Sequence, residues 1–486
     1  MGLKENIVTS IKNLTNDVSL EEEKLAVAQS LLWGRLVTYH EIVTTLKQHD
    51  LADFLEKLIM LAQKIPAVEG LPLTCQRCNN QMTSAFSDLP DTEQGETIAY
   101  CLNCLNMGRI IQGEYLYFLA SPPSKPLPAN TSLLTWKGQL SHEQARGASD
   151  LVTSLSDPKR PHSMIAVTGA GKTEMIFPVI QHVLLQGGRV AIASPRIDVC
   201  LELFPRLQEA FASVKMVLLY GGTDEPYSYT PLVISTTHQL LRFKEAFDLL
   251  IVDEVDAFPY AGDDSLHFAV KRAVKAQGKL VYLTATPDKT LNRAIESDEM
   301  TRTLLPARYH GYPLPEPSFY WVGDWRVCIY QRKQSSRLWQ LVKRFSQLAG
   351  VKLIFLPNID LAESMLLWLE SDLRAVKVAC VHSKDPLRKE KVQMVRDGEI
   401  ELLLSTTILE RGVTFTNCQV CILGAESRLF NAAALVQMSG RVGRKQDYPS
   451  GELIYAHQGI SWAMKQAQKQ ILQMNIEARE RGLMTR

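Results

Sequence analysis

Ala166-Val167-Thr168-Gly169-Ala170-Gly171-Lys172-Thr173 is the stretch that decides the fold of this chain. It follows a short apolar run and precedes a helix-like stretch, which is the context of a phosphate-binding loop. We predict that Gly169 and Gly171 let the backbone approach a phosphate closely, because glycine has no side chain. Lys172 would reach the β- and γ-phosphates, and Thr173 would ligate Mg²⁺. The stretch therefore predicts a nucleotide pocket on an α/β domain.

An acidic pair follows another apolar run farther along the chain. Phe247–Val252 leads directly into Asp253 and Glu254, so both carboxylates are expected at the tip of a buried strand. We predict that Asp253 binds Mg²⁺ and that Glu254 orients or deprotonates an attacking water. Gln144 precedes the phosphate loop by an interval that suits an adenine-binding glutamine, and nearby Gln139 is the alternative.

A third element lies far downstream and carries two arginines. Gln437, Arg441 and Arg444 are spaced at i, i+4 and i+7, which predicts that they share one helix face. A planar guanidinium matches a phosphoryl group, and an arginine from a neighbouring domain stabilises charge during phosphoryl transfer. We predict that Arg444 is this arginine finger and that Arg441 contacts the γ-phosphate beside it. A solvated basic helix start is the alternative, although the glycines between these residues disfavour an ordinary helix.

Short apolar runs alternate with helix-like stretches in two successive blocks. In the first block they are Met164–Val167, Val190–Ala193, Leu232–Ile234, Leu249–Val252 and Leu280–Leu283. In the second block they are Lys352–Leu356, Val376–Val381, Glu401–Leu404 and Val420–Leu423. Near-continuous apolar strands between helices indicate parallel sheets covered on both faces. The sequence thus predicts two tandem α/β domains with functional groups at the carboxyl ends of their strands.

Hydroxyl and basic side chains follow several of these strands. They could contact a sugar-phosphate backbone without reading its sequence, and the candidates are Arg196, Thr236, Thr237, Thr406, Thr407 and Arg411. A cap or turn is the alternative for each residue taken alone. Thr284 and Thr286 are expected either to hydrogen-bond Asp256 or to serve as simple caps. The basic stretch 384–391 is expected to be a solvated helix face or to flank a nucleic-acid path.

Four of the nine cysteines form two Cys-x-x-Cys pairs. Cys75 and Cys78 are separated from Cys101 and Cys104 by 22 residues, a spacing that predicts a tetrahedral four-thiolate zinc site. An iron–sulfur cluster and a metal-free module are the alternatives. Residues 71–112 carry a net charge of −2, so we expect this module to act as a scaffold or protein-docking element rather than to bind DNA.

The composition indicates a multidomain protein. At 486 residues the chain suffices for roughly three domains of ~150 residues. The net charge is +1, but residues 1–70 sum to −3 and residues 71–112 to −2, so a polyanion-binding surface is expected after residue 112. No apolar signal core and no run near the ~20 apolar residues of a membrane span occur, so a cytosolic protein is expected.

Two Pro-rich joints, at 121–128 and 309–317, separate the expected domains. The order is a mostly helical N-terminal segment (1–70), a four-cysteine zinc module (71–112), a first α/β domain (113–305), a Pro-rich hinge (306–320) and a second α/β domain (321–486). Within the first segment, helices are expected at 21–32 and 42–61.

The phosphate loop and the segments 253–256, 284–286, 405–414 and 437–444 together resemble superfamily 2 helicases and translocases over roughly residues 134–450. The resemblance implies two RecA-like domains with ATP and Mg²⁺ between them and a nucleic-acid strand across their tops. An alanine at the first loop position, here Ala166, is usual in that superfamily. The segments Asp253-Glu254-Val255-Asp256 and Arg411-Gly412-Val413-Thr414 differ from the pattern of DEAD-box RNA helicases and argue against that assignment.

The segments 32–35, 100–109 and 305–311, together with the cysteine pairs, make the whole chain similar to the ComFA family of late-competence ATPases from Gram-positive bacteria. The resemblance implies DNA-stimulated ATP hydrolysis, single-stranded DNA binding and uptake of transforming DNA at the inner face of the cell membrane. It also implies a ComEC-like membrane channel and a ComFC-like phosphoribosyltransferase-like protein as partners, and it leaves a homo-oligomer open.

Two other functions remain open at this point. A PriA-like replication-restart or repair helicase also combines this motor with zinc-binding cysteines, but there the cysteines lie inside the helicase region. A nucleotide-gated DNA-binding adaptor could instead cycle slowly without net translocation. The motifs are common to a motor and to such a switch.

Overall fold

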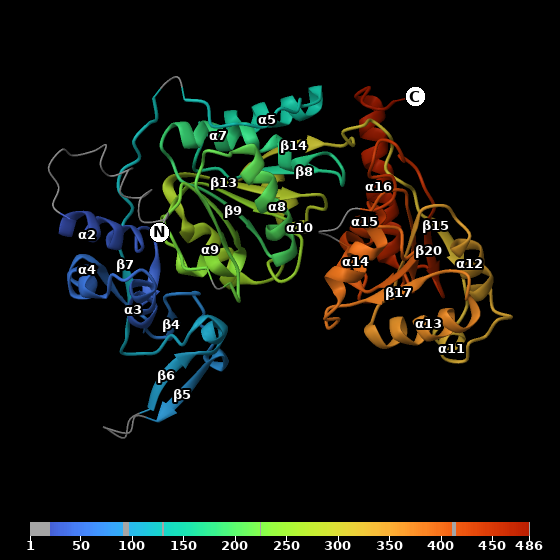
Figure 1. Ribbon diagram of the computed structural model, residues 1–486, viewed down its shortest axis with the longest axis horizontal. Coiled ribbons are helices and arrows are strands. Elements are labelled where there is room, and N and C mark those ends of the chain that lie inside the picture. Colours follow the sequence, from blue (N-terminus) through green and yellow to red (C-terminus); the bar gives the residue numbers. More distant parts are fainter. Residues whose placement is uncertain (1–19, 91–96, 129–130, 224, 411–414, 486) are drawn as a thin grey trace.

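The computed structural model of the protein describes residues 20–90, 97–128, 131–223, 225–410 and 415–485. It consists of an N-terminal unit (residues 20–118), a first α/β domain (domain 1, 131–305), a connecting segment (306–317) and a second α/β domain (domain 2, 318–485). Figure 1 shows the N-terminal unit (blue) against domain 1 (green), with domain 2 (orange to red) on the other side of domain 1. None of the helices in these ranges has both the length and the apolar composition needed to cross a membrane.

Domain 1 is built on a seven-stranded parallel sheet. The strands, in spatial order, are β10 (Met216–Leu219), β11 (Leu232–Thr236), β9 (Val190–Ser194), β12 (Phe247–Asp253), β13 (Val274–Thr284), β8 (His162–Ala166) and β14 (Thr301–Leu305). The helices are α5 (His142–Ser154), α6 (Lys172–Met175), α7 (Phe177–Leu185), α8 (Ile197–Ala210), η4 (Thr237–Arg242), α9 (Asp264–Ala273) and α10 (Lys289–Glu296). In Figure 1, α5 and α7 lie on one face of the sheet and α9 lies on the other.

Alternate residues of the central strands pack into different cores. In β9, Val190 and Ile192 belong to the core under α7 and α8, whereas Ala191 and Ala193 belong to the core on the opposite face. Successive strand residues point to opposite faces, so a sheet covered on both sides needs apolar residues at every position. This requirement explains the unbroken apolar runs in the sequence.

Domain 2 repeats the architecture with a six-stranded parallel sheet. The strands, in spatial order, are β15 (Ser318–Trp321), β20 (Leu453–His457), β19 (Cys418–Leu423), β16 (Val351–Phe355), β18 (Leu402–Ser405) and β17 (Val378–Val381). The helices are α11 (Trp325–Tyr330), α12 (Arg337–Ser346), α13 (Ile359–Asp372), α14 (Arg388–Arg396), η5 (Thr407–Leu409), α15 (Ala432–Ser439) and α16 (Trp462–Glu480). The prediction of two tandem α/β domains with parallel sheets is therefore confirmed.

All nine expected strands are present, and the described parts of the two α/β domains contain four further strands that were not predicted. Three of the four, β10, β14 and β15, lie at sheet edges. An edge strand has a neighbour on one side only and tolerates polar residues, which weakens the apolar signal of β14 and β15. The sequence of β10 is apolar throughout, so this reason does not apply to it. The fourth, β20, lies inside the domain 2 sheet between β15 and β19.

The N-terminal unit contains helices around a small antiparallel sheet with the order β1 (Leu36–Thr38), β7 (Tyr115–Phe118) and β2 (Gln63–Pro66). Its helices are α2 (Leu20–Ser30), α3 (Tyr39–Gln48), η1 (Ala52–Phe54), α4 (Leu55–Leu61), η2 (Thr83–Ala85) and η3 (Leu102–Met107). Two hairpins, β3 (Val68–Glu69) with β4 (Thr74–Cys75) and β5 (Phe86–Pro90) with β6 (Thr97–Cys101), form the cysteine segment.

Two expectations for this unit need correction. The single helix-like stretch expected at 42–61 is interrupted, because Asp50 adopts a left-handed conformation (φ 56°) between α3 and η1. The expected boundary after residue 112 would separate β7 from its partners β1 and β2. We therefore propose that the N-terminal unit extends to Phe118, and that domain 2 begins at Ser318 with β15 rather than at residue 321.

The N-terminal unit and domain 1 share one hydrophobic core. The same cluster contains Leu32 and Leu36 from the unit and Ala191 and Ala193 from the domain 1 sheet. Gly34 lies directly against domain 1, since a Cβ added to it would lie 2.7 Å from Cβ of Ala246. The carbonyl of Gly34 also accepts a hydrogen bond of 2.9 Å from the backbone N–H of Lys244. The unit is therefore a fixed part of domain 1.

We expect Gly34→Ala to destabilise the packing of the N-terminal unit. Both Gly34 (φ 68°) and Gly113 (φ 87°) are left-handed, but a Cβ on Gly113 would meet nothing within 4 Å. Gly113→Ala should therefore lower the free energy of unfolding by ~1–2 kcal/mol, the cost of placing a residue with a Cβ in the left-handed region. Gly34→Ala should lower it by a further ~1–3 kcal/mol, because the added methyl group overpacks the contact with Ala246. Thermal unfolding and the rate of limited proteolysis between the unit and domain 1 measure the difference. Equal effects of the two substitutions would contradict this packing.

Candidate nucleotide site and cysteine cluster

A cavity of ≈ 610 Å³ lies between the two α/β domains and collects the predicted nucleotide residues. From domain 1 it is lined by Gly169, Gly171, Lys172, Thr173, Asp253 and Glu254, with Gln139 and Gln144 at the same cavity. From domain 2 it is lined by Gln437, Arg441 and Arg444. Residues separated by more than 250 positions in the sequence thus face one space.

The phosphate loop connects β8 to α6 and depends on two left-handed glycines. Gly169 has φ 84°, and Gly171 has φ 78° and begins α6 as its N-cap. Glycine is favoured at this left-handed φ, and a Cβ on Gly171 would lie 2.2 Å from Nε2 of Gln144 and displace that amide. Gln144 in turn donates a hydrogen bond of 3.0 Å from Nε2 to the carbonyl of Ala170, and its Oε1 accepts one of 2.9 Å from the backbone of Ser141. Gln144 therefore braces the loop from α5.

The acidic turn stands opposite the loop lysine. Nζ of Lys172 lies 3.8 Å from Oδ1 of Asp253, the last residue of β12. Glu254 adopts a left-handed conformation (φ 57°), which is uncommon for a residue other than glycine, and its N–H donates to Oδ1 of Asp253 at 2.8 Å. Such local strain is often found at functional sites, where surrounding contacts hold a side chain in a required direction.

The threonines after β13 contact the same turn. Thr284 and Thr286 donate hydrogen bonds to the two carboxylate oxygens of Asp256, at 2.8 Å and 2.5 Å respectively. The predicted hydrogen bonds to Asp256 are confirmed. They join the tips of β12 and β13, so the acidic turn is positioned relative to the neighbouring strand.

The prediction that Gln437, Arg441 and Arg444 share one helix face is wrong. α15 ends at Ser439, and both arginines lie in the turn that follows. Gly440, the C-cap of α15, packs against the phosphate loop, and an added Cβ would lie 2.1 Å from Oγ1 of Thr168. The three side chains nevertheless line the same cavity.

Arg441 is a buried cation directed at this cavity. Its side chain is 4% exposed, and among the residues that the structure describes its Nε and Nη1 have no hydrogen-bond partner. Burial, and after it the charge of Arg444, lowers the pKa of Arg441 to about 9. Leaving a buried guanidinium unpaired is costly, so the site is arranged for an anion.

Arg308 connects the phosphate loop to the arginine turn, a contact that the motif analysis missed. It is buried, and its guanidinium donates to the carbonyls of Gly443 at 2.6 Å and Val442 at 2.8 Å, the two residues between Arg441 and Arg444. The next residue, Tyr309, donates its N–H to the carbonyl of Gly169 in the phosphate loop at 3.1 Å. The only sequence signal was that residues 305–311 formed part of the family resemblance.

The predicted nucleic-acid residues have different surroundings. Thr237 has no exposed side-chain surface, because it lies inside η4 against the domain 1 core, and this contradicts a direct contact with nucleic acid. Arg196 donates to the carbonyl of Ile408 at 3.0 Å and lies 3.5 Å from Glu410, so it bridges the two domains. Arg411 lies outside the described residues.

Of the remaining candidates, one is buried and two are partly accessible. Thr236 is 4% exposed, and Thr406 and Thr407 at the start of η5 are half-buried. The basic stretch 384–391 is partly an interdomain contact, because Arg388 forms an ion pair with Asp198 of α8.

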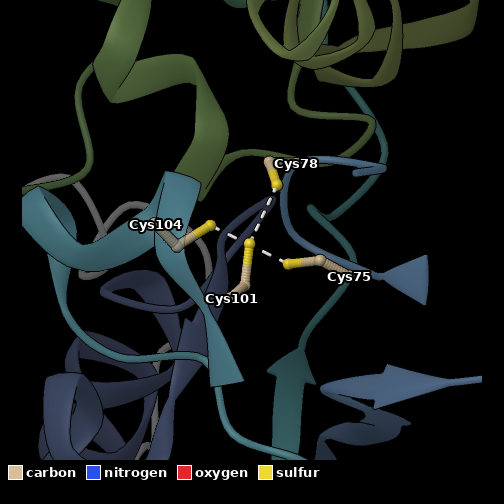
Figure 2. A group of neighbouring side chains, drawn as sticks. All are labelled: Cys75, Cys78, Cys101 and Cys104. Atoms are coloured by element: carbon tan, nitrogen blue, oxygen red, sulfur yellow. Dashed lines mark hydrogen bonds between the residues drawn. The ribbon is translucent and has the colours of Figure 1, made fainter. Parts of the chain in front are cut away.

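The four cysteines of the two pairs converge in the N-terminal unit. Cys75 and Cys78 come from β4 and the turn after it, and Cys101 and Cys104 come from the end of β6 and from η3. Figure 2 shows the four side chains pointing toward one another. All four are buried, and their sulfur atoms lie within 4.8 Å of one another.

The sulfur spacing fits a single tetrahedral ion. A Zn–S distance of about 2.3 Å places the ligand sulfurs about 3.8 Å apart. The Sγ–Sγ distances are 3.8 Å between Cys75 and Cys104 and 3.6 Å between Cys78 and Cys101, far longer than the ~2.05 Å of a disulfide. The donor set could hold zinc without rearrangement.

A side chain of domain 1 donates hydrogen bonds to the backbone between Cys75 and Cys78. Nη1 of Arg272 donates to the carbonyls of Gln76 at 2.8 Å and Arg77 at 2.7 Å, inside the Cys-x-x-Cys turn. Arg77 itself is buried and pairs with Glu41 of α3. The cluster therefore lies at the junction of α3, the cysteine segment and α9.

The fold and the divided cavity define a superfamily 2 helicase-type ATPase. Three protein families match parts of the chain. They are the DEAD/DEAH box helicase over residues 147–294, the helicase conserved C-terminal domain over 335–446, and the competence protein ComFA N-terminal domain over 21–118.

Solved helicase structures share the fold of the two α/β domains. Dbp5 of S. cerevisiae bound to RNA and ADP BeF3 superposes with a TM-score of 0.51 at 14% identity, covering 69% of this chain and 91% of that chain. Mss116 bound to ssRNA and UDP-BeF gives 0.51 at 18%, covering 65% and 70%. At these identities, both structures show a common fold alone.

Relatives that match along most of the chain identify its family within superfamily 2. The chain is 42% identical over 402 residues to competence protein ComFA of Bacillus subtilis, covering 82% of this chain and 85% of that protein. It is 41% identical over 447 residues to ComFA of Streptococcus pneumoniae, covering 92% and 98%. Replication restart protein PriA of Rickettsia typhi is 27% identical over 195 residues, covering 36% and 29%. The chain belongs to the ComFA family.

We expect Cys101→Ser to remove bound zinc from the purified protein. Loss of an outer-shell partner alone costs 10–100-fold in metal affinity, so loss of a thiolate should cost more than about 100-fold. Cys328→Ser, at a buried cysteine in α11 of domain 2, should leave the zinc content unchanged. Elemental analysis and limited proteolysis of the N-terminal unit provide the measurements. Retention of full zinc content by Cys101→Ser would contradict the assignment of this ligand.

Proposed function

We propose that the protein is a DNA-stimulated ATPase that moves along single-stranded DNA and drives the uptake of transforming DNA during natural competence. The observation that carries the ATPase is Arg441, a buried guanidinium with unpaired nitrogens on the cavity wall opposite the phosphate loop. The biological task rests on membership of the ComFA family.

Domain 1 would bind the nucleotide. Gly169 and Gly171 present backbone N–H groups to the phosphates, and Lys172 neutralises their charge. Thr173 and Asp253 would supply oxygen ligands for Mg²⁺, which would neutralise phosphate charge at this site. Gln144 already braces the phosphate loop, and from that position its amide can also contact the adenine.

Hydrolysis would require both domains. Glu254 orients or deprotonates the attacking water, and its left-handed backbone directs the carboxylate toward the cavity. Gln437 and Arg441 contact the terminal phosphate from domain 2. Arg444 acts as the arginine finger and stabilises the charge that spreads over the phosphoryl oxygens in the transition state. Because these groups sit on different domains, domain closure controls the rate.

The DNA strand would cross the tops of both domains and touch Arg196, Thr236, Thr406, Thr407 and Arg411. Arg196 supports this path, since it already joins domain 1 to Ile408 and Glu410 of domain 2. A contact that spans the domain junction is broken and remade as the domains open and close. Nucleotide turnover can in this way change the grip on the strand.

The family also supports a place for the motor in the cell. We propose that it works at the inner face of the cell membrane beside a ComEC-like channel and a ComFC-like phosphoribosyltransferase-like protein. Zinc bound by Cys75, Cys78, Cys101 and Cys104 would keep the N-terminal unit folded. A PriA-like replication-restart role has weaker support, because that similarity covers about a third of the chain.

We expect Lys172→Ala to abolish ATP hydrolysis and Arg444→Ala to lower kcat by about 10³-fold or more, as for other arginine fingers. Single-stranded DNA should stimulate the wild-type rate, and duplex DNA and RNA should stimulate it less. Arg374→Ala, beyond the end of α13 on the exposed surface of domain 2, is the matched control and should keep the wild-type rate. An ATPase indifferent to single-stranded DNA would rule out the proposed activity.

Translocation needs a separate measurement from hydrolysis. A motor should displace streptavidin from one end of a biotinylated single strand in an ATP-dependent manner, and Arg444→Ala should not. Stimulated hydrolysis without displacement from either end would instead favour the nucleotide-gated adaptor.

We expect Arg308→Lys to lower kcat by about 10–100-fold with little change in the KM for ATP. The lysine keeps the charge but lacks the planar fork that donates to Val442 and Gly443 together, and hydrogen bonds of charged groups are worth ~1.5–3 kcal/mol. Arg302→Lys, at an exposed position on β14, should have no effect. Wild-type turnover by Arg308→Lys would show that the arginine turn is positioned without this contact.

A further inference from the structure

A second cavity lies outside the nucleotide site, between the N-terminal unit and domain 1. Its volume is ≈ 1240 Å³, about twice that of the nucleotide cavity. The domain 1 wall includes residues at or just after the carboxyl ends of β9, β10 and β11: Pro195, Ile197, Tyr220, Gly221, Thr236 and His238. The opposite wall comes from the start of α3, from η3 and from β7. We call this cavity the N-terminal groove.

The N-terminal wall presents aromatic rings to the groove. Tyr39, the first residue of α3, is 51% exposed, and Tyr115, the first residue of β7, is 47% exposed. Tyr39 packs against Tyr117 with a ring-centroid distance of 6.4 Å, which holds it in place. Exposed His40 and Arg109 line the groove beside these rings.

The groove is continuous with the face across which the DNA strand would run. Pro195 and Ile197 line the groove, and Arg196 between them reaches Ile408 and Glu410 of domain 2. Thr236, predicted to contact nucleic acid, also lines the groove. A strand that leaves the domain junction at Arg196 therefore enters the groove directly.

The lining of the groove carries as many arginines as carboxylates, so its formal charge is balanced. Glu41 is held between Arg77 and Arg242, with Nε of Arg242 at 2.6 Å from its carboxylate. Arg77 lies behind the groove wall and is fully buried. The lining itself carries the arginines Arg35, Arg109 and Arg242 and the carboxylates Glu41, Glu114 and Glu225. On the domain 1 side, Gly221 and Gly222 have open space where a Cβ would project, so their backbone is accessible to a bound strand.

We propose that the N-terminal groove binds single-stranded DNA, with bases stacking on Tyr39 and Tyr115 and the backbone passing over Gly221 and Gly222. This inference rests on the proposed function, because it extends the strand path of the motor. Stacking on exposed aromatic rings is available to single strands, whereas in a duplex the bases stack on one another. The rings, histidines and arginine of the groove match bases and phosphates rather than the aliphatic side chains of a protein helix.

The groove would give the motor a grip that does not depend on domain closure. Gly34 and Arg272 fix the N-terminal unit to domain 1, so both walls of the groove move as one body. Contacts across the domain junction change during each cycle, but those in the groove persist. The net charge of −2 argued against a DNA-binding role for residues 71–112. Within this segment, however, Asp88 lies on β5, and the β5–β6 hairpin projects away from domain 1 in Figure 1. Arg109 of the same segment lines the groove.

The test compares full-length, zinc-loaded proteins: wild type, Tyr39→Ala/Tyr115→Ala, Tyr39→Phe/Tyr115→Phe, and Tyr330→Ala as an exposed-tyrosine control on α11 of domain 2. Binding of labelled oligo-dT of increasing length is measured by fluorescence anisotropy, together with ATPase rates with and without DNA. Loss of each stacked ring weakens binding by about tenfold.

We expect the double alanine variant to bind long oligonucleotides at least about tenfold more weakly, and to need correspondingly more DNA for half-maximal stimulation. Its ATPase without DNA, its zinc content and its melting temperature should match wild type, and the phenylalanine variant and Tyr330→Ala should bind normally. Wild-type DNA affinity in the double alanine variant would overturn the groove proposal while leaving the motor intact. Retained DNA binding with loss of binding to a purified ComFC-like protein would likewise overturn it and assign the groove to a protein. A wild-type enzyme without any DNA response would instead overturn the proposed function itself.

Discussion

The structure depends on one buried cation that contacts two backbone carbonyls. Arg308 leaves domain 1 beside the phosphate loop and donates to Val442 and Gly443 in domain 2. The two residues that it holds lie between Arg441 and Arg444, so the position of both arginines follows from this contact. A charged guanidinium buried without a carboxylate is expensive, and burial lowers the pKa of Arg308 to about 9. Such a cost is tolerated where it fixes the geometry of a site.

Sequence reasoning succeeded where the chemistry is local. The phosphate loop, the acidic turn and the cysteine pairs each occupy a few consecutive residues, and their glycines, carboxylates and thiolates indicate what the backbone must do. The parallel sheets were also predictable, because strands buried on both faces need apolar residues at every position. The edge strands β14 and β15 contain polar residues and lacked this signal, whereas β10 is apolar and was not predicted despite it.

The errors came from contacts between distant segments. Nothing near Gly440 in the sequence indicates that Thr168 packs against it or that α15 ends at Ser439. Thr237 has a hydroxyl suited to a phosphate contact, but the fold buries it. Similarly, Arg308 has no local motif, since its partners lie more than 130 residues downstream. The N-terminal groove was invisible for the same reason, because its two walls come from separate parts of the chain.

The order of strands in the N-terminal sheet has a consequence for biosynthesis. β7 lies between β1 and β2 in space but follows both in sequence, so the sheet cannot form until the ribosome has made residue 118. The surface that covers the unit includes Ala246 and Arg272, which emerge much later still. Such non-local contacts fold slowly. During that interval all four cysteines of the cluster have been made but their docking surface has not, so the cluster can form before the N-terminal unit docks on domain 1.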